Sequence, residues 1–399
     1  MNWNKLLYKA WKDYYSKQKG KYLSAYIKSF VDDYKTKIQC VEQSLQQRQY
    51  KFNTWKAILI PKNDEGFRPI IKPISISDKL VLKAISIYLS MILEPVFDRV
   101  SSISYAYQKG KSTRDALIQL RKIHNPKNIL LKIDIKHFFD EIDKTILINL
   151  LNEYSLDEYI QKLIFESLNP IVDYSGIKEC DIDKFPKGGI PQGNSISNVL
   201  SNLYLYELDK LALSNKWKMV RYADDMVLSV SNIDEAKLVL SQIERYLLDN
   251  RKLTIHQLGD LSKSKTYIFL NLRKEPMLYL GVMFNGEKLY PAPICYDTLK
   301  NRIKTVLSST STVKEKEISI QNAISQWCGY YAFTDIPQNK LKRLNTTINY
   351  LINKCELNIS NVNIGRVLEQ TRKHQNNKLA KMFAPKPIGK EFWWLNIYS

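Results

Sequence analysis

Three aspartates are the residues whose type and placement best suit chemistry. Asp224 and Asp225 lie in RYADDMVLSV (221–230), where apolar runs flank the acidic pair like the arms of a tight hairpin. Asp134 closes an earlier apolar run, NILLKID. A buried strand end is a costly place for an unpaired carboxylate, so we expect neighbouring strands of one sheet to bring the three together.

Carboxylates grouped in this way suit divalent ions. Mg²⁺ prefers hard oxygen ligands and keeps several waters, so two or three carboxylates suffice to hold it. A pair of such ions can aim a hydroxyl at a phosphate and stabilise the leaving group. The simpler interpretation of Asp-Asp is a polar turn, because aspartate is a favoured turn former.

The surrounding pattern predicts the elements that position these residues. It indicates strands at 55–61 and 128–135, a turn with a basic tip at 61–69, and hairpins at 219–230 and 278–290. Helices are predicted within 3–50, over 76–99, 195–213 and 234–249, from Lys144, and through most of 298–383. Since there is no parallel βαβ rhythm or glycine-rich phosphate fingerprint, the prediction is an α+β palm.

Composition narrows the class of protein. The five cysteines are scattered without CxxC spacing, so we expect reduced, mostly buried thiols in a cytoplasmic protein and no zinc site. The apolar stretch 80–97 contains Lys83 and Glu94 and favours a core helix over a membrane span. The N-terminus lacks the pattern of a signal peptide, and no membrane partner is expected.

The excess positive charge lies at the two ends of the chain. Lys and Arg number 60 against 40 Asp and Glu, a formal net charge of +20. Residues 1–56 carry +8, residues 299–399 carry +10, and the middle carries only +2. Basic flanks can be solvated helix faces, but two of them around a near-neutral centre favour two walls that grip a nucleic-acid backbone.

A series of motifs resembles the conserved blocks of reverse transcriptases from group II introns, retrons and related bacterial retroelements. In order they are ILIPKNDEGFRPI, SYAYQKGKS, LKIDIKHFFDEID, GGIPQGNSISNVLSNLYL, RYADDMVLSV, SKSKT and YLGVMF. They extend over about 55–285, well over half of the chain. The resemblance implies a right-hand polymerase with fingers, palm and helical thumb.

The resemblance also implies roles for individual residues. Asp134 and Asp224 match the ligands that bridge two Mg²⁺ ions, with Mn²⁺ as an alternative ion, and Asp225 is the neighbouring carboxylate. Lys62 and Arg68 match cations that contact the incoming triphosphate, although an exposed basic turn explains them as well.

Four further residues match positions around the nucleotide. Phe139 matches an aromatic gate beneath the sugar, which implies dNTP substrates; the alternative is that Phe138 and Phe139 are both core residues, and at least one of them is. Gln192 matches the residue along the nucleotide, Gly193 allows a close backbone approach, and Lys265 matches a lysine proposed to protonate or neutralise departing pyrophosphate.

The C-terminal part carries weaker signals. Tyr279, Leu280 and Gly281 resemble a primer grip, though a plain hairpin explains them nearly as well. IQNAISQWCGYYAF (320–333) resembles an intron-type thumb, whose helices would follow an RNA–DNA duplex by shape. Basic residues that suit this task are Lys300, Arg302, Lys304, Lys340, Lys342 and Arg343. The expected domains are an N-terminal basic helical extension (1–54), fingers and palm (55–290), and thumb with tail (291–399).

The implied function is RNA-directed DNA synthesis from dNTPs on an RNA template, giving cDNA. The chain lacks the maturase and endonuclease regions of intron enzymes and the Val-Thr-Gly element of retron enzymes, and has Ser197-Asn198 where Ser-Pro is usual. These departures leave the other bacterial reverse transcriptases that the motif series resembles, several groups of which act in phage defence with a dedicated noncoding RNA. The resemblance therefore implies an antiphage-defence enzyme that works with a noncoding RNA.

Three alternatives stay open: a template-independent polymerase, a protein-primed one, and a silent RNA-binding scaffold. Tyr398 is a candidate for the priming residue. Trp393 and Trp394 could dock on the body of the protein, on another subunit or on an unpaired base. A homo-oligomer or a partner protein is also left open.

Overall fold

The computed structural model describes residues 1–18, 24–61, 66–260, 264–355 and 362–383, the last seven of these by backbone alone. Lys62, Trp393, Trp394 and Tyr398 lie outside the described residues. By compactness the chain divides into two units, Met1–Pro276 and Met277–Ser399. The expected domain boundaries after residues 54 and 290 stay predictions.

The central sheet of the first unit is antiparallel, with strand order β5-β6-β3-β7. Its strands are β3 (Ile129–Asp134), β5 (Met219–Tyr222), β6 (Asp225–Val230) and β7 (Tyr267–Phe269). Helix α5 (Thr113–Ile123) packs on β5, and α11 (Ile233–Arg251) packs on β3 and β6. The predicted strand at 128–135 and hairpin at 219–230 are confirmed.

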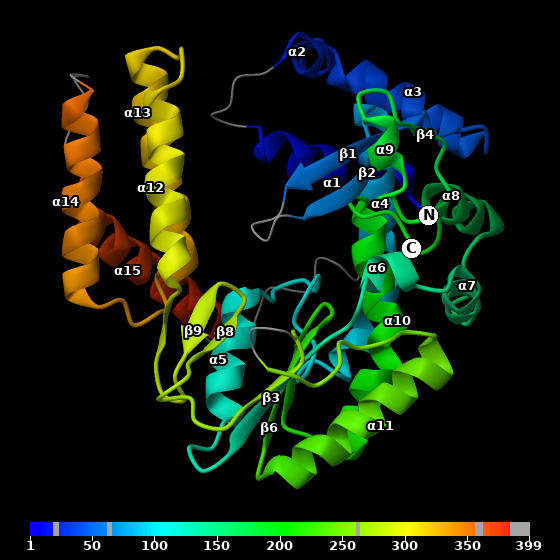
Figure 1. Ribbon diagram of the computed structural model, residues 1–399. Coiled ribbons are helices and arrows are strands. Elements are labelled where there is room, and N and C mark those ends of the chain that lie inside the picture. The colour runs from blue at the N-terminus through cyan, green and yellow to red at the C-terminus, as the bar shows by residue number, and fades with distance from the viewer. Residues whose placement is uncertain (19–23, 62–65, 261–263, 356–361, 384–399) are drawn as a thin grey trace, which may run out of the picture. The chain divides into compact units, whose positions relative to one another are not determined.

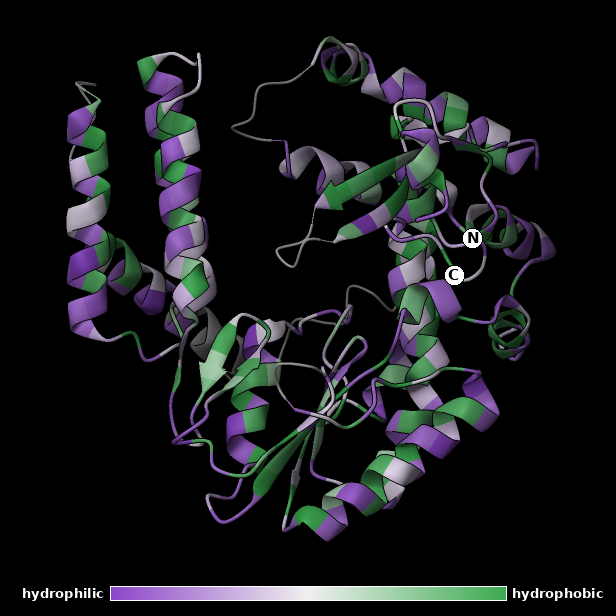
Figure 2. Cartoon of the chain, in the orientation of Figure 1, coloured by the Kyte–Doolittle hydropathy of each residue, from purple (hydrophilic) through white to green (hydrophobic). Residues whose placement is uncertain are grey.

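Helix α11 shows how sequence pattern becomes packing. Its side chains Ala236, Val239, Leu240, Ile243 and Leu247 recur every three or four residues and are buried. The same helix carries polar residues on its other faces, so both colours run along it in Figure 2. One apolar stripe therefore attaches the helix to the sheet.

A second sheet of this unit has the strand order β2-β1-β4. It consists of β1 (Trp55–Pro61), β2 (Phe67–Pro73) and the short β4 (Val172–Asp173). Near it in Figure 1 lie helices α1 (Trp3–Ser16), α2 (Ala25–Asp32), α3 (Tyr34–Gln46) and α9 (Glu179–Ile182). Helix α7 (Lys144–Asn152) packs on α10 (Ser195–Ser214), and α8 (Glu158–Leu168) packs on α4 (Ile76–Asp98).

Helix α4 (Ile76–Asp98) is the one helix within the described residues that is long and apolar enough to cross a membrane. It packs instead against α1 and α10 (Ser195–Ser214), and Leu80, Val81 and Ile85 are fully buried. The core helix of a soluble protein passes the same test of length and composition. The prediction of a core helix at 80–97 is confirmed.

The second unit begins with a meander of β8 (Met277–Tyr279), β9 (Val282–Phe284) and β10 (Leu289–Pro291). The predicted hairpin at 278–290 therefore has a third strand. Four helices follow: α12 (Pro293–Leu307), α13 (Val313–Tyr331), α14 (Gln338–Lys354) and α15 (Ile364–Phe383). Residues after 298 are mostly helical, as predicted.

The exposure of the cysteines differs from the prediction. All five are free thiols, as expected, but Cys40, Cys180 and Cys355 are exposed and only Cys328 is buried. The expectation of mostly buried thiols was wrong. These three cysteines lie on surface positions of short or amphipathic helices and their ends, where a small residue is tolerated facing water.

Candidate active site

The strand register brings the predicted carboxylates together. Asp134, the last residue of β3, lies directly opposite Asp225, the first residue of β6. The two carboxyl groups share a hydrogen bond, and Asp224 lies within electrostatic reach of both. Two aspartate sites far apart in the sequence therefore meet at one end of neighbouring buried strands.

A two-residue turn presents Asp224. Tyr222 pairs with Asp225, so Ala223 and Asp224 form the tip of the β5–β6 hairpin. Ala223 has φ 57°, a left-handed conformation that costs a non-glycine residue about 1–2 kcal/mol. Such local strain needs support from the surrounding structure, and here it lies next to an acidic residue of the site.

That support comes from Arg221, a buried arginine that sequence reasoning missed. Its guanidinium donates to both carboxylate oxygens of Asp209 in α10, at 2.7 and 2.5 Å. It also donates to the carbonyl oxygen of Ala223 at 2.8 Å, to the Ser104 hydroxyl at 2.9 Å and to Asn202 at 3.3 Å. The turn is thus tied to helix α10 from beneath.

Crowding of like charges shapes the electrostatics of the site. Burial and then the neighbouring Asp225 raise the pKa of Asp224 to about 6. Burial also raises the pKa of Asp225, and Lys132, 3.7 Å away, opposes that rise. Carboxylates that repel one another in this way are ready to be neutralised by bound cations.

Two basic side chains contact Asp134. Lys265 Nζ lies 3.4 Å and His256 Nε2 lies 3.3 Å from Asp134 Oδ2. The backbone N–H of Asp134 donates to the hydroxyl of Thr266 at 3.3 Å, so the residue after Lys265 also fixes this strand end. The structure places the predicted Lys265 at the site and adds His256, which no motif had indicated.

The donor set fits divalent ions. Three carboxylates converge, and oxygen ligands are what Mg²⁺ prefers. Among the described residues no three His, Cys, Asp or Glu side chains already surround a single point. Mg²⁺ is commonly held by one or two carboxylates together with waters and substrate phosphates, so a preformed protein cage is not required.

Of the two predicted triphosphate-binding cations, the structure describes Arg68 but not Lys62. Arg68 lies in β2 opposite Ile60 of β1 and is exposed. Both Asp224 and Arg68 influence the pKa of Tyr107, which burial raises first of all. Arg68 and the acidic site therefore lie within electrostatic reach of the same tyrosine.

The two phenylalanines at the predicted sugar gate differ in burial. Phe138 is buried in the core and Phe139 is only partly buried, and their rings meet edge to face at 5.3 Å. Both belong to the short helix α6 (Phe138–Glu141). Phe139 lies five residues after Asp134, so strand β3, which ends at Asp134, also positions the Phe139 ring.

Gly193 lies close to strand β2, while the close approach to a nucleotide that the motif implies stays a prediction. It has φ 104°, and a Cβ atom at this position would lie 2.9 Å from Cγ2 of Ile70. The Gln192 side chain donates to Asp140 at 3.4 Å.

In the second unit, Tyr279 is buried and Leu280 and Gly281 form the turn between β8 and β9.

The central sheet with three carboxylates at one end defines a polymerase-type palm of α+β class. The chain belongs to the reverse transcriptase (RNA-dependent DNA polymerase) family, whose model matches residues 60–284. That region includes every predicted site residue from Lys62 to Lys265.

Two relatives illustrate the extent of the similarity. The group II intron-encoded protein LtrA of Lactococcus lactis is 30% identical over 224 residues, 56% of this chain and 36% of the relative. The retron Ec83 reverse transcriptase of Escherichia coli is 26% identical over 194 residues, 49% of this chain and 58% of the relative. The chain thus spans only part of the length of either relative.

Among solved structures, apo telomerase from Candida tropicalis is similar at TM-score 0.48 and 14% identity, over 84% of this chain and 68% of that one.

Proposed function

We propose that this protein is an RNA-directed DNA polymerase that adds dNTPs to a primer on an RNA template. The observation that carries the proposal is the pairing of Asp134 with Asp225 at the tip of the Asp224 turn, within a chain of the reverse transcriptase family. A polar surface turn would not need a second carboxylate from a distant strand, and it would not bury an arginine beneath itself.

Each residue has a part in this proposal. Asp134, Asp224 and Asp225 would hold two Mg²⁺ ions, which supply activation of the attacking hydroxyl and neutralisation of the triphosphate. Arg68 binds phosphate oxygens by paired N–H donors. Phe139 blocks the space that a 2′-hydroxyl would need, and Lys265 donates a proton to the departing pyrophosphate.

The test compares the protein with an Asp224→Asn, Asp225→Asn variant. The nucleic acid that co-purifies with each is sequenced, and dNTP incorporation is measured on that RNA with Mg²⁺. Asp249→Asn, the same type of substitution at an exposed carboxylate of α11, serves as a control outside the site. A faithful complement made by the protein and the control, and absent with the double variant, supports the proposal.

The other outcomes identify the alternatives. Untemplated homopolymer indicates a template-independent polymerase of the same fold. Bound RNA without aspartate-dependent cDNA indicates a silent RNA-binding scaffold. Labelled product that stays attached to the chain in SDS, and is lost in Tyr398→Phe, indicates protein priming.

We also propose that the template is a dedicated noncoding RNA and that the enzyme acts in antiphage defence. The similarity to a retron reverse transcriptase and the motif resemblance support this step. Phage plaquing on cells that express the protein or the Asp224→Asn, Asp225→Asn variant tests it. Equal plaquing on both would refute the defence role without affecting the proposed chemistry.

A further inference from the structure

The loop that carries Gln192 is fixed between the gate helix α6 and strand β2. The backbone N–H of Ile190 donates to the carbonyl oxygen of Phe139 at 2.8 Å. The N–H of Ile71 in β2 donates to the carbonyl oxygen of Gln192 at 3.1 Å. The backbone at Gln192 is therefore held from both sides.

At Gly189 the loop touches the backbone of α6 directly. This residue has φ 67°, and a Cβ atom there would lie 2.2 Å from the carbonyl oxygen of Phe139 and 2.4 Å from the carbonyl carbon of Asp140. Its neighbour Gly188 would place a Cβ atom at an ordinary 3.5 Å from the Asp140 oxygen. Only the second glycine of the pair is required for this contact.

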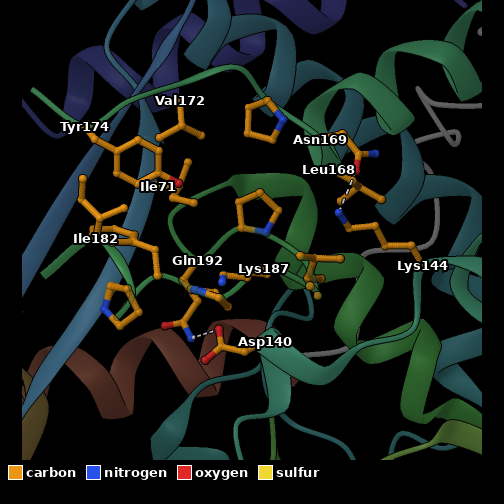
Figure 3. Close-up of a pocket in the computed structure, with 18 of the residues that line it drawn as sticks. Ile71, Asp140, Lys144, Leu168, Asn169, Val172, Tyr174, Ile182, Lys187 and Gln192 are labelled. Atoms are coloured by element: carbon orange, nitrogen blue, oxygen red, sulfur yellow. Dashed lines mark hydrogen bonds between the residues drawn. The ribbon is translucent and has the colours of Figure 1, made fainter. Parts of the chain in front are cut away.

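The side chain of Gln192, in contrast to its backbone, borders a cavity of about 470 Å³. Figure 3 shows the Gln192 side chain beside this cavity, with the Asp140 side chain facing the Gln192 amide. Its Nε2 donates to Asp140 Oδ1 at 3.4 Å, and among the described residues this is the one hydrogen bond that the Gln192 amide makes. Packing cannot fix the amide on its open side, so this hydrogen bond has the larger share in orienting it.

The chemistry of the pair sets the direction of the amide. An ionised carboxylate has only acceptor atoms, so the NH₂ end of Gln192 must face Asp140 and the oxygen must face away from it. Asp140 also lies on the same short helix as Phe139, the residue before it. The orientation of Gln192 is thus linked to the position of the predicted sugar gate.

We propose that Asp140 is a positioning residue for the nucleotide, acting through Gln192. This rests on the proposed function, because the nucleotide is the dNTP of that reaction. With Asp140 in place, Gln192 presents its amide oxygen to the nucleotide in one orientation. Without Asp140 the amide rotates at the cavity edge, and the nucleotide is bound less tightly before the chemical step.

Steady-state incorporation of single dNTPs on a primed RNA template tests this inference. Asp140→Ala should raise the KM for dNTP roughly tenfold while kcat changes less than twofold, since binding rather than chemistry loses an interaction. Asp140→Asn keeps an oxygen acceptor for the Gln192 amide and should restore most of the loss. Asp183→Ala removes a carboxylate from the same cavity at a 90% exposed position and should leave KM unchanged.

A double-mutant cycle separates this role from general damage to the fold. Gln192→Ala should itself raise KM, and adding Asp140→Ala to it should then change KM less than twofold, because both act through one interaction. If the KM increases of Asp140→Ala and Gln192→Ala multiply in the double variant, the inference is overturned. A lower kcat at unchanged KM in Asp140→Ala, not restored by Asp140→Asn, would also overturn it. No incorporation by the unaltered protein would instead refute the proposed function.

Discussion

Replacing Arg221 by Met provides the sharpest test of how the site is supported. The substitution leaves Asp209, which is fully buried, without its cation, and breaking a buried ion pair from one side costs about 3–5 kcal/mol. Removing both charges in Arg221→Met, Asp209→Leu avoids the unpaired carboxylate, so most of this stability should return. The carbonyl of Ala223 still lacks its donor in the double variant.

Stability and activity should therefore separate. A shift of about 1 Å in a reacting group can cost on the order of 100-fold in rate, so nucleotide incorporation should stay strongly reduced in the double variant. Urea unfolding, monitored by circular dichroism, measures the stability of each variant, and single-nucleotide incorporation measures its activity. Arg245→Met breaks an exposed pair with Asp249 on α11 and should change stability by less than about 0.5 kcal/mol. Recovery of full activity in the double variant would refute a positioning role for Arg221.

Three other substitutions have defined outcomes. Gly189→Ala should lower the unfolding free energy by at least about 2 kcal/mol, while Gly188→Ala should have little effect. Only Gly189 has a positive φ, and only there would a Cβ atom clash with the backbone of α6. The midpoints of urea unfolding measure both effects. Phe139→Val should raise the ratio of rNTP to dNTP incorporation by roughly tenfold or more, and an unchanged ratio would remove Phe139 as the gate. Burial lowers the pKa of Lys111 to about 8, below its value in the unfolded chain. Between pH 8 and about 10.5 the unfolded chain therefore binds more protons than the folded one, so the contribution of Lys111 to stability rises with pH there. Lys111→Met should abolish this part of the pH dependence of the unfolding free energy.

The sequence predicted the acidic centre because local pattern and position agreed there. Alternating or continuous apolar residues identified β3, β5 and β6, and a carboxylate at a strand end is conspicuous in such a pattern. The motif series added Phe139, Gln192 and Lys265 as candidates, and the roles of the first two stay predictions. The structure brings the last of these to Asp134, as expected.

What the sequence could not give was pairing between elements. Asp209 lies in the sequence between Glu207 and Lys210, so nothing local marked it as a buried residue or identified Arg221 as its partner. Asp140 likewise reads as an ordinary helix residue until the loop at Gln192 is placed against it. The third strand at 289–291 was missed because three-residue strands leave almost no periodicity.

The buried ion pair also bears on why the site is built in this way. Two apolar side chains of similar volume in place of Arg221 and Asp209 would be about as stable, so stability alone does not explain the pair. An apolar pair could not donate to the carbonyl of Ala223, whose residue is held at positive φ beside Asp224. The arginine reaches that carbonyl only because Asp209 compensates its charge beneath the hairpin. The ion pair therefore sustains a strained turn, and the strained turn carries one of the carboxylates on which the proposed chemistry depends.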